Sequence, residues 1–174
     1  MFSPEIGERS VKEVEQLVKQ MIGKQEVIQA VNEMFITMDR FDWDGFLKCF
    51  ADEVEDDYTS LFKGGPNKVK HSDVLERWKY LKKFSALYHS LSNHKVTVRG
   101  DDADCYSYVY SMHVLSDNGR NDIWKVIGFY DHHLVRTATG WKMDRMKFTA
   151  VSVTGVDVLR KLGVYDKIQD KWKV

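Results

Sequence analysis

The stretch Ala103-Asp-Cys-Tyr-Ser-Tyr-Val-Tyr-Ser-Met-His-Val-Leu115 decides the fold. Its aromatic and β-branched residues are typical of a strand, and Ser116-Asp117-Asn118-Gly119 carries a hairpin-turn signal directly after it. A second long strand is predicted over 122–136 and a third over 141–153, with a turn at 137–140 between them. Three long antiparallel strands predict a large sheet in the second half of the chain.

The first half is helical by its apolar spacing. Ser10 and Glu13 fit a capping box that opens a helix over 10–22, and Gly23 marks its C-cap. A second helix is predicted over 25–40. The remaining predicted elements are a short helix over 42–50, a strand over 53–61, a fourth helix over 72–85, a strand over 94–99, and a short helix followed by a polar tail from 156. Helices before a sheet predict the α+β class, with the helices packed on one face.

Composition limits the classes of function. The 174 residues suit one domain, and Lys plus Arg (26) equals Asp plus Glu (26), which argues against a nucleic-acid binder and fits an uncharged small-molecule ligand. We find no apolar stretch of about 18 residues and no signal peptide, so no membrane contact and a cytoplasmic location are expected. Neither a nucleotide loop nor a zinc-protease motif occurs. Cys49 and Cys105 alone cannot build a cysteine cage, and no spacing among the six histidines calls for a metal site.

Three polar residues stand out as candidates for chemistry. His89 precedes the strands, where partial burial would favour the neutral ring of a general base, although a core histidine bonded to a carbonyl fits equally well. Asp39 ends the second helix, where the helix dipole opposes its charge, so it is either exposed or partnered. His113 lies on a strand face of small residues, above which the pattern allows either packed helices or a cavity.

The other candidates have simpler interpretations. Tyr58 shares a strand face with Val54 and Asp56 and fits a packed core tyrosine with a bonded hydroxyl. Asp131 shares its face with Phe129, and this face is either the solvent side or a pocket wall. The tryptophans, Trp78 among them, are most simply core residues.

The order of several motifs resembles a SnoaL-like domain of the nuclear-transport-factor-two-like superfamily over residues 25–155. The motifs are Phe41-Asp42-Trp43-Asp44, Val54-Glu55-Asp56-Asp57-Tyr58, His89-Ser90-Leu91-Ser92-Asn93, Gly100-Asp101 and Thr139-Gly140-Trp141-Lys142. The resemblance implies a cone-shaped α+β barrel, in which a curved, mainly antiparallel sheet wraps around N-terminal helices and an apolar cavity. We therefore expect one SnoaL-like domain over 1–174, with helix 10–22 and tail 156–174 as extensions.

Within that superfamily the pattern is similar to the scytalone dehydratases and, in pairing Asp39 with His89, to hexachlorocyclohexane dehydrochlorinase. The resemblance implies that Asp39 orients His89 as the base, that Tyr58 donates to an enolate oxygen, and that His113 holds or protonates the departing hydroxyl. The residues expected to contact the substrate are Met38, Trp78, Phe129 and Asp131. The pattern departs from the dehydratases where they have a tyrosine (here Met38), a polar residue (Phe129) and an asparagine (Asp131).

The resemblance thus predicts a cofactor-independent lyase acting on a small cyclic or aromatic hydroxy-ketone. One alternative is a SnoaL-like protein that binds a small molecule without chemistry. Another is an isomerase like ketosteroid isomerase with Asp56 as base, which ranks lower because Met38 and Phe41 stand where a tyrosine would help. A homodimer or homotrimer is expected, with the aromatic face of Tyr106, Tyr108 and Tyr110 as candidate interface.

Overall fold

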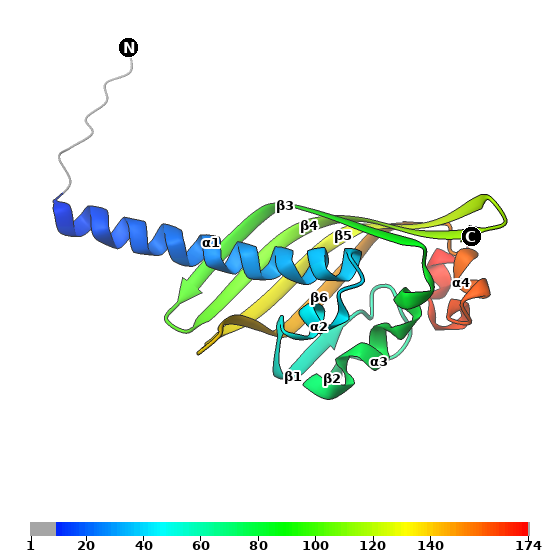
Figure 1. The fold of residues 1–174 in the computed structure, drawn as a ribbon, viewed down its shortest axis with the longest axis horizontal. Helices are drawn as coiled ribbons and strands as arrows, with labels where there is room; N and C mark the ends of the chain where they lie inside the picture. The colour runs from blue at the N-terminus through cyan, green and yellow to red at the C-terminus, as the bar shows by residue number, and fades with distance from the viewer. Residues whose placement is uncertain (1–9, 174) are drawn as a thin grey trace, which may run out of the picture.

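A computed structural model describes residues 10–173 (Figure 1). Residues 1–9, on which the expectation of no signal peptide rests, and residue 174 lie outside the described residues. The helical elements, with η for 3-10 helix, are α1 (Val11–Asp39), α2 (Trp43–Leu47), η1 (His71–Asp73), α3 (Val74–Trp78), η2 (Lys79–Lys83), α4 (Val158–Lys161), η3 (Tyr165–Lys167) and η4 (Asp170–Trp172). The strands are β1 (Phe50–Asp57), β2 (Asn67–Lys70), β3 (Ala86–Arg99), β4 (Asp102–Asp117), β5 (Arg120–Thr137) and β6 (Gly140–Thr154).

One six-stranded sheet forms the body of the molecule, in the order β2-β1-β6-β5-β4-β3. All neighbouring strands are antiparallel except β1 and β6, which are parallel. The β4–β5 hairpin turns at Asn118 and Gly119, whose φ angles of 48° and 78° are the left-handed values that a tight hairpin needs. The sheet is curved and unclosed, and α1 crosses one of its faces (Figure 1). The α+β class predicted from the sequence is therefore confirmed.

Alternation along β4 creates the floor beneath α1. The small-residue face of this strand is buried, and it consists of Ala103, Cys105, Ser107, Val109 and Ser111 together with His113. The tyrosines between them point to the outer face, where Tyr108 is 47% and Tyr110 37% exposed. Small side chains on the inner face leave room between the sheet and the helix.

The prediction of two helices separated at Gly23 was wrong, because α1 is one continuous helix of 29 residues. The capping box at its start is confirmed: the Ser10 hydroxyl accepts from the Glu13 amide, and the Glu13 carboxylate accepts from the Ser10 amide. Gly23 is buried, and a Cβ there would lie 4.0 Å from Val98 on β3. The glycine therefore lies where α1 packs against the sheet rather than at a helix end.

The single helix predicted over 72–85 is replaced by three short pieces, η1, α3 and η2. Lys79, Lys82 and Lys83 would crowd one side of a continuous helix with like charges, which disfavours it. Trp78 and Leu81 both face inward, and they are 7% and 2% exposed. This segment therefore forms a wall over one end of the sheet.

Two strand predictions also needed correction. β3 begins at Ala86 rather than at 94, so His89 lies within a strand, and a bulge between Ser92 and Lys95 separates it from the part that was predicted. β2 was not predicted; it is four residues long and pairs with β1 at the sheet edge. A segment this short and rich in lysine has little strand propensity in its sequence. Short, charged edge strands of this kind limit unwanted pairing with strands of other chains.

The C-terminal segment, whose placement the sequence left open, docks on the loop after β1. Ile168 bridges to Phe62, Gln169 donates to the Thr59 carbonyl at 2.9 Å, and the Trp172 indole donates to the Ser60 carbonyl at 2.9 Å. Residues from α4 to η4 therefore close one end of the molecule.

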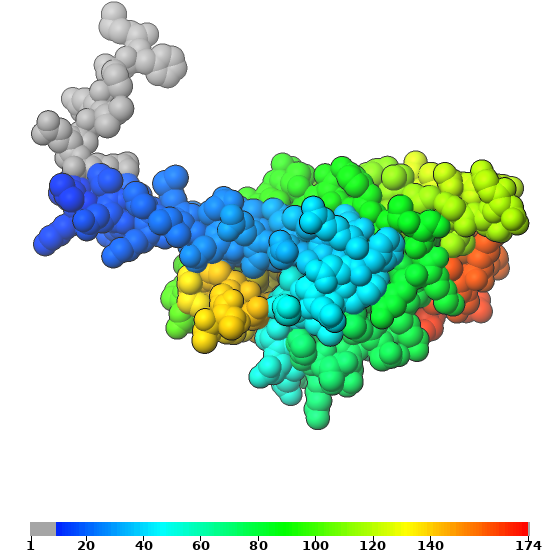
Figure 2. Space-filling view, viewed as in Figure 1, coloured from blue at the N-terminus to red at the C-terminus, as the bar shows by residue number. Residues whose placement is uncertain are grey.

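The first turns of α1 project beyond the sheet (Figure 2). Val11 is 75% and Met21 69% exposed, so the apolar stripe of this part of the helix is uncovered. Within residues 10–173, no helix combines the length and the apolar character that crossing a bilayer requires.

Candidate active site

Asp39 is the last residue of α1, where the chain turns sharply into α2. The Asp42 amide donates to the Thr37 carbonyl at 2.9 Å, and Phe41 adopts a left-handed φ of 56° to make this corner. A carboxylate at the C-terminal end of a helix faces the negative pole of the helix dipole. Its charge therefore needs a partner from elsewhere in the fold.

His89 on β3 is that partner and contacts both carboxylate oxygens. Its ring Nδ1 lies 2.6 Å from Asp39 Oδ1, and its backbone N–H donates to Oδ2 at 2.8 Å. Because a carboxylate only accepts, the neutral ring carries its proton on Nδ1 and keeps the lone pair of Nε2 free. Only 6% of the His89 side chain and 21% of the Asp39 side chain are exposed. The result is a shielded and oriented imidazole.

His113 on β4 meets His89 edge to face, with 5.2 Å between ring centroids. Its Nδ1 lies 3.3 Å from the Trp124 carbonyl oxygen, to which it donates, and its ring stacks on the Trp124 indole at 4.5 Å. Burial holds the pKa of His113 well below its usual value, and charge on His89 lowers it further. His113 is therefore neutral near pH 7, with Nε2 able to accept a hydrogen bond.

Tyr58, just after β1, pairs its hydroxyl with that of Tyr130 on β5 at 3.1 Å. The Tyr58 hydroxyl also lies 3.7 Å from the sulfur of Met146. Burial, with the neighbouring Tyr130 phenol as a smaller cause, raises the pKa of Tyr58 well above its usual value. Tyr58 therefore stays protonated and can serve as a hydrogen-bond donor.

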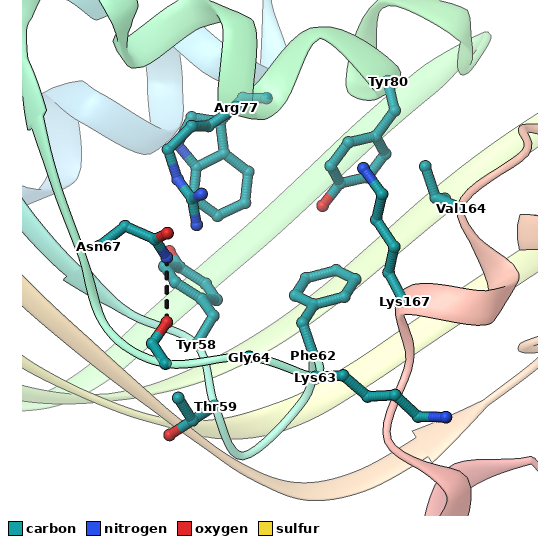
Figure 3. A pocket seen from close by; sticks show the side chains of 12 residues that line it. Tyr58, Thr59, Phe62, Lys63, Gly64, Asn67, Arg77, Tyr80, Val164 and Lys167 are labelled. Atoms are coloured by element: carbon teal, nitrogen blue, oxygen red, sulfur yellow. Dashed lines mark hydrogen bonds between the residues drawn. The ribbon is translucent and has the colours of Figure 1, made fainter.

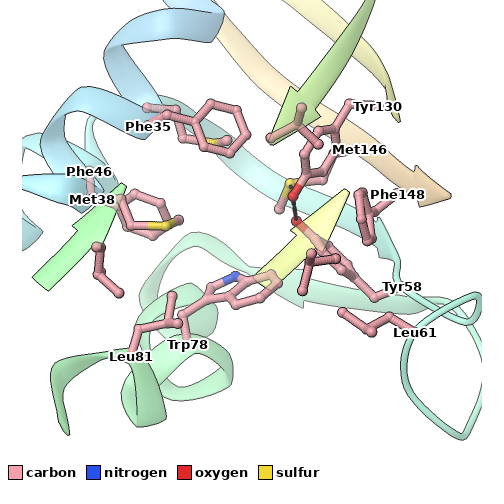
Figure 4. Packing of buried hydrophobic residues seen from close by; sticks show 14 of the residues in the cluster. Phe35, Met38, Phe46, Tyr58, Leu61, Trp78, Leu81, Tyr130, Met146 and Phe148 are labelled. Atoms are coloured by element: carbon pink, nitrogen blue, oxygen red, sulfur yellow. Dashed lines mark hydrogen bonds between the residues drawn. The ribbon is translucent and has the colours of Figure 1, made fainter. Parts of the chain in front are cut away.

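His89, His113 and Tyr58 line one internal cavity of about 40 Å³ between α1 and the sheet, and Asp39 contacts His89 from outside its lining. Met38 and Trp78 line it too, as do Phe35, Ser111 and Tyr130. The Trp78 indole N–H is buried without a hydrogen-bond partner among the described residues, and Figure 4 shows it on the ring edge facing this space. A cavity of this size has room for little more than one water, so a ring entering it must displace a flexible side chain such as Met38.

Phe129 and Asp131 are not brought to this cavity, contrary to the prediction from the sequence. Strand alternation puts both on the outer face of β5, while Tyr130 between them faces inward. Sequence reasoning missed Tyr130, although a signal was present. The signal is that the even-numbered positions from Trp124 to Leu134, which form one face of this strand and include Tyr130, carry no formal charge. The other face holds Lys125 and Asp131.

Asp56, the base that an isomerase of the ketosteroid type would require, is occupied by hydrogen bonds to other side chains. Its side chain is 1% exposed and accepts from Arg77 Nε at 2.5 Å and from Asn67 Nδ2 at 3.1 Å. Burial raises the pKa of Asp56, and the two donors oppose that rise. A carboxylate held in this way anchors Arg77 and does not face the cavity of His89.

No cluster of three or more histidine, cysteine, aspartate or glutamate side chains with metal-binding geometry occurs within residues 10–173. His132 and His133 are adjacent on β5 and point to opposite faces. His132 is buried, and His133 on the outer face contacts Asp144 Oδ1 through Nδ1 at 2.6 Å. The second pair resembles Asp39–His89 in its ring contact but lies outside the cavity.

The buried His132 makes the free energy of unfolding depend on pH. Burial lowers the pKa of His132 from 6.5 to about 3, and neither ring nitrogen has a well-formed hydrogen bond among the described residues. As pH falls from 6.5 towards 3, the unfolded chain binds a proton here that the folded chain does not, so stability is complete above this range and lost within it.

We expect His132→Leu to flatten the acid dependence of folding. Between pH 6 and pH 4, the free energy of unfolding of the wild type should fall by about 1.4 kcal/mol per pH unit more than that of the variant. Urea unfolding at several pH values measures this difference. Equal slopes for His132→Leu and wild type would contradict the assignment.

Solved structures with this fold match the chain closely in shape. The Kfla4162 protein from Kribbella flavida is 27% identical, with a TM-score of 0.75, and the match covers 81% of this chain and 99% of that one. A protein from Novosphingobium aromaticivorans provisionally named a scytalone dehydratase is 14% identical, with a TM-score of 0.68 and coverage of 78% and 89%. The dehydrochlorinase LinA-type3 from Novosphingobium barchaimii is 14% identical, with a TM-score of 0.63 and coverage of 79% and 92%.

At 14% identity, the last two structures show a shared fold alone. Curated proteins give no match to the sequence. The family model of the SnoaL-like domain matches residues 21–147, well over half of the chain, and leaves out the projecting first turns of α1. The protein therefore belongs to the SnoaL-like domain family, as its curved sheet around α1 also indicates.

Proposed function

We propose that the protein is a cofactor-independent lyase that removes water from a small cyclic or aromatic hydroxy-ketone. The observation that carries the proposal is the double contact of Asp39 with the ring and the backbone of His89. It fixes the tautomer that leaves Nε2 as a base, and the carboxylate supports the positive charge that the ring gains. Neighbours in fold that are named for dehydration and dehydrochlorination, both eliminations, agree with this class of reaction.

The reaction uses the cavity residues in turn. His89 Nε2 removes the proton from the carbon next to the ketone, and the C–H electron pair moves into an enolate whose oxygen accepts a hydrogen bond from Tyr58. The enolate then forms the carbon–carbon double bond as the neighbouring C–O bond breaks. The departing hydroxyl, held by a hydrogen bond that it donates to His113 Nε2, takes the proton from His89 and leaves as water. The base is thereby restored.

Tyr130 supports the donor role of Tyr58. When the Tyr130 hydroxyl donates to the Tyr58 oxygen, the Tyr58 proton is free for the substrate. The dehydratases have a tyrosine at the position of Met38, and Tyr130 places a second phenol beside Tyr58 from the sheet instead.

A role in binding without chemistry is the second candidate, and it would use the same cavity. A receptor pocket needs donors and acceptors, but it has no need of an imidazole held at two points by a carboxylate. The Asp39–His89 geometry therefore favours the lyase.

We also propose that copies of the chain associate through the outer face of the sheet, as a dimer or trimer. Tyr88, Ile127 and Val151 on this face are 51%, 41% and 59% exposed, next to the outward tyrosines of β4. Apolar surface of this kind on a sheet marks an interaction site.

A panel of cyclic and aromatic hydroxy-ketones tests the function. Elimination places the new double bond in conjugation with the ketone, so turnover is seen as a rise in ultraviolet absorbance. We expect turnover of at least one compound in buffer that contains EDTA and no added cofactor. Activity that EDTA abolishes and a metal ion restores would contradict the proposal.

A further inference from the structure

A second pocket opens beside the inner cavity and shares four aromatic residues with it. This mouth pocket has a volume of about 180 Å³ and lies between the loop after β1, the α3–η2 segment and the C-terminal segment (Figure 3). The shared side chains are Tyr58, Phe62, Trp78 and Tyr80. A molecule that reaches His89 by this route passes through the mouth pocket.

Arg77 is held so that its outer nitrogens face the mouth pocket. Its Nε donates to the buried Asp56, which Asn67 holds from a second direction. No hydrogen bond within residues 10–173 uses the terminal Nη atoms of Arg77, and 31% of its side chain is exposed. A guanidinium fixed through Nε presents two parallel Nη donors, the geometry that matches a carboxylate.

The lining of the mouth pocket carries three basic side chains, one of which, Arg77, is paired with Asp56 outside the lining. Lys63, Arg77 and Lys167 contribute to it, and its 12 lining residues include no aspartate or glutamate. Lys63 is paired with Asp170 at 2.8 Å, whereas Lys167 forms no ion pair within the described part of the chain. Figure 3 shows the Lys167 amine reaching in beside Tyr80, whose hydroxyl also points into the pocket.

The volumes of the two pockets also favour the mouth pocket as the site for a ring. A cavity of about 150 Å³ accommodates a benzene ring. The mouth pocket reaches this volume, while the inner cavity of about 40 Å³ does not. The mouth pocket is therefore the place where a ring fits beside Arg77 without displacing a side chain.

We propose that the mouth pocket binds the carboxylate of an aromatic or cyclic ligand, with Arg77 as bidentate partner and Lys167 as second cation. Phe62, Trp78 and Tyr80 would contact the ring that carries the carboxylate. The inference rests on the proposed function for the identity of this ligand as substrate, and it narrows that substrate to a carboxylate-bearing one. Binding itself does not require the reaction.

Benzoate and its neutral analogue benzamide test the inference by titration in NMR. We expect the wild type to bind benzoate about tenfold more tightly than benzamide. The double variant Asp56→Asn/Arg77→Gln, which leaves no unpaired buried charge, should lose this preference, and Lys167→Gln should weaken benzoate binding by about threefold. Lys12→Gln, on the projecting end of α1, removes the same charge elsewhere and should change nothing.

Equal affinity for benzoate and benzamide in the wild type, or a preference kept by the double variant with an intact fold, would overturn the inference. His89→Ala separates it from the proposed function, because His89 does not line the mouth pocket. This variant should keep the benzoate preference. If the preference is present and no hydroxy-ketone is turned over, the carboxylate site stands and the lyase does not.

Discussion

His89→Ala should lower kcat for any substrate of the cavity by about 10²- to 10⁴-fold, the usual contribution of a positioned general base. The imidazole that Asp39 orients is then gone, and His113, neutral and bonded to the Trp124 carbonyl, is not oriented to replace it. Steady-state kinetics on a compound from the hydroxy-ketone panel measures the loss.

The chain provides a matched control for this variant. His133 contacts Asp144 at 2.6 Å, the same ring-to-carboxylate distance as in the cavity, but on the outer face of the sheet. His133→Ala removes the same side chain from the same kind of pair, and kcat should not change. A His89→Ala variant that folds normally and keeps wild-type kcat would contradict the role of His89 as base.

Asp39→Asn should lower kcat by a similar factor, about 10²- to 10⁴-fold, with the shape of the site preserved. An amide has one acceptor and one donor end, whereas His89 presents two donors, its ring Nδ1–H and its backbone N–H. If the amide oxygen faces the ring, the amide NH2 group faces the His89 backbone N–H, and these two donors repel each other. If the amide nitrogen faces the ring, Nδ1 must accept, the proton moves to Nε2, and the base is blocked.

The Asp39→Asn variant has a readout besides activity. The nitrogen chemical shifts of the His89 ring report which tautomer is present, and Asp144→Asn beside His133 serves as control. A structural cost of about 1–3 kcal/mol in the free energy of unfolding is also expected, because one donor loses its acceptor. Wild-type kcat in Asp39→Asn would show that the carboxylate does not orient the base.

The large features of the fold could be predicted from the sequence because they are local. Strong β-propensity and turn signals define the long strands, and the capping box at Ser10 defines the start of α1. Element boundaries failed where tertiary contacts decide them. Gly23 looks like a helix end in isolation, but in the fold it is a buried position within α1 that faces β3.

The candidate site was less accessible to sequence reasoning. Asp39 and His89 are 50 positions apart, and no periodicity relates a helix end to a strand interior, so their contact was expected only from resemblance. Phe129 and Asp131 were chosen one position away from the inward face, and a one-residue error on a strand moves a side chain to the opposite face.

The net charge of the whole chain does not describe the surroundings of the mouth pocket. The chain has equal numbers of acidic and basic residues, a balance that fits an uncharged molecule. The fold distributes these charges unevenly, and the lining of the mouth pocket contains cations without acids. A total over the whole chain does not report the field at one opening.

The central claim is that His89, oriented by Asp39, takes a proton from carbon, and hydrogen exchange measures this step alone. Cyclic ketones incubated with the protein in D₂O lose the NMR signal of the hydrogens next to the carbonyl if a base removes them, whether or not a leaving group is present. The account predicts exchange above the buffer rate with the wild type and with His133→Ala, and exchange at the buffer rate with His89→Ala. Equal exchange rates for wild type and His89→Ala would contradict it.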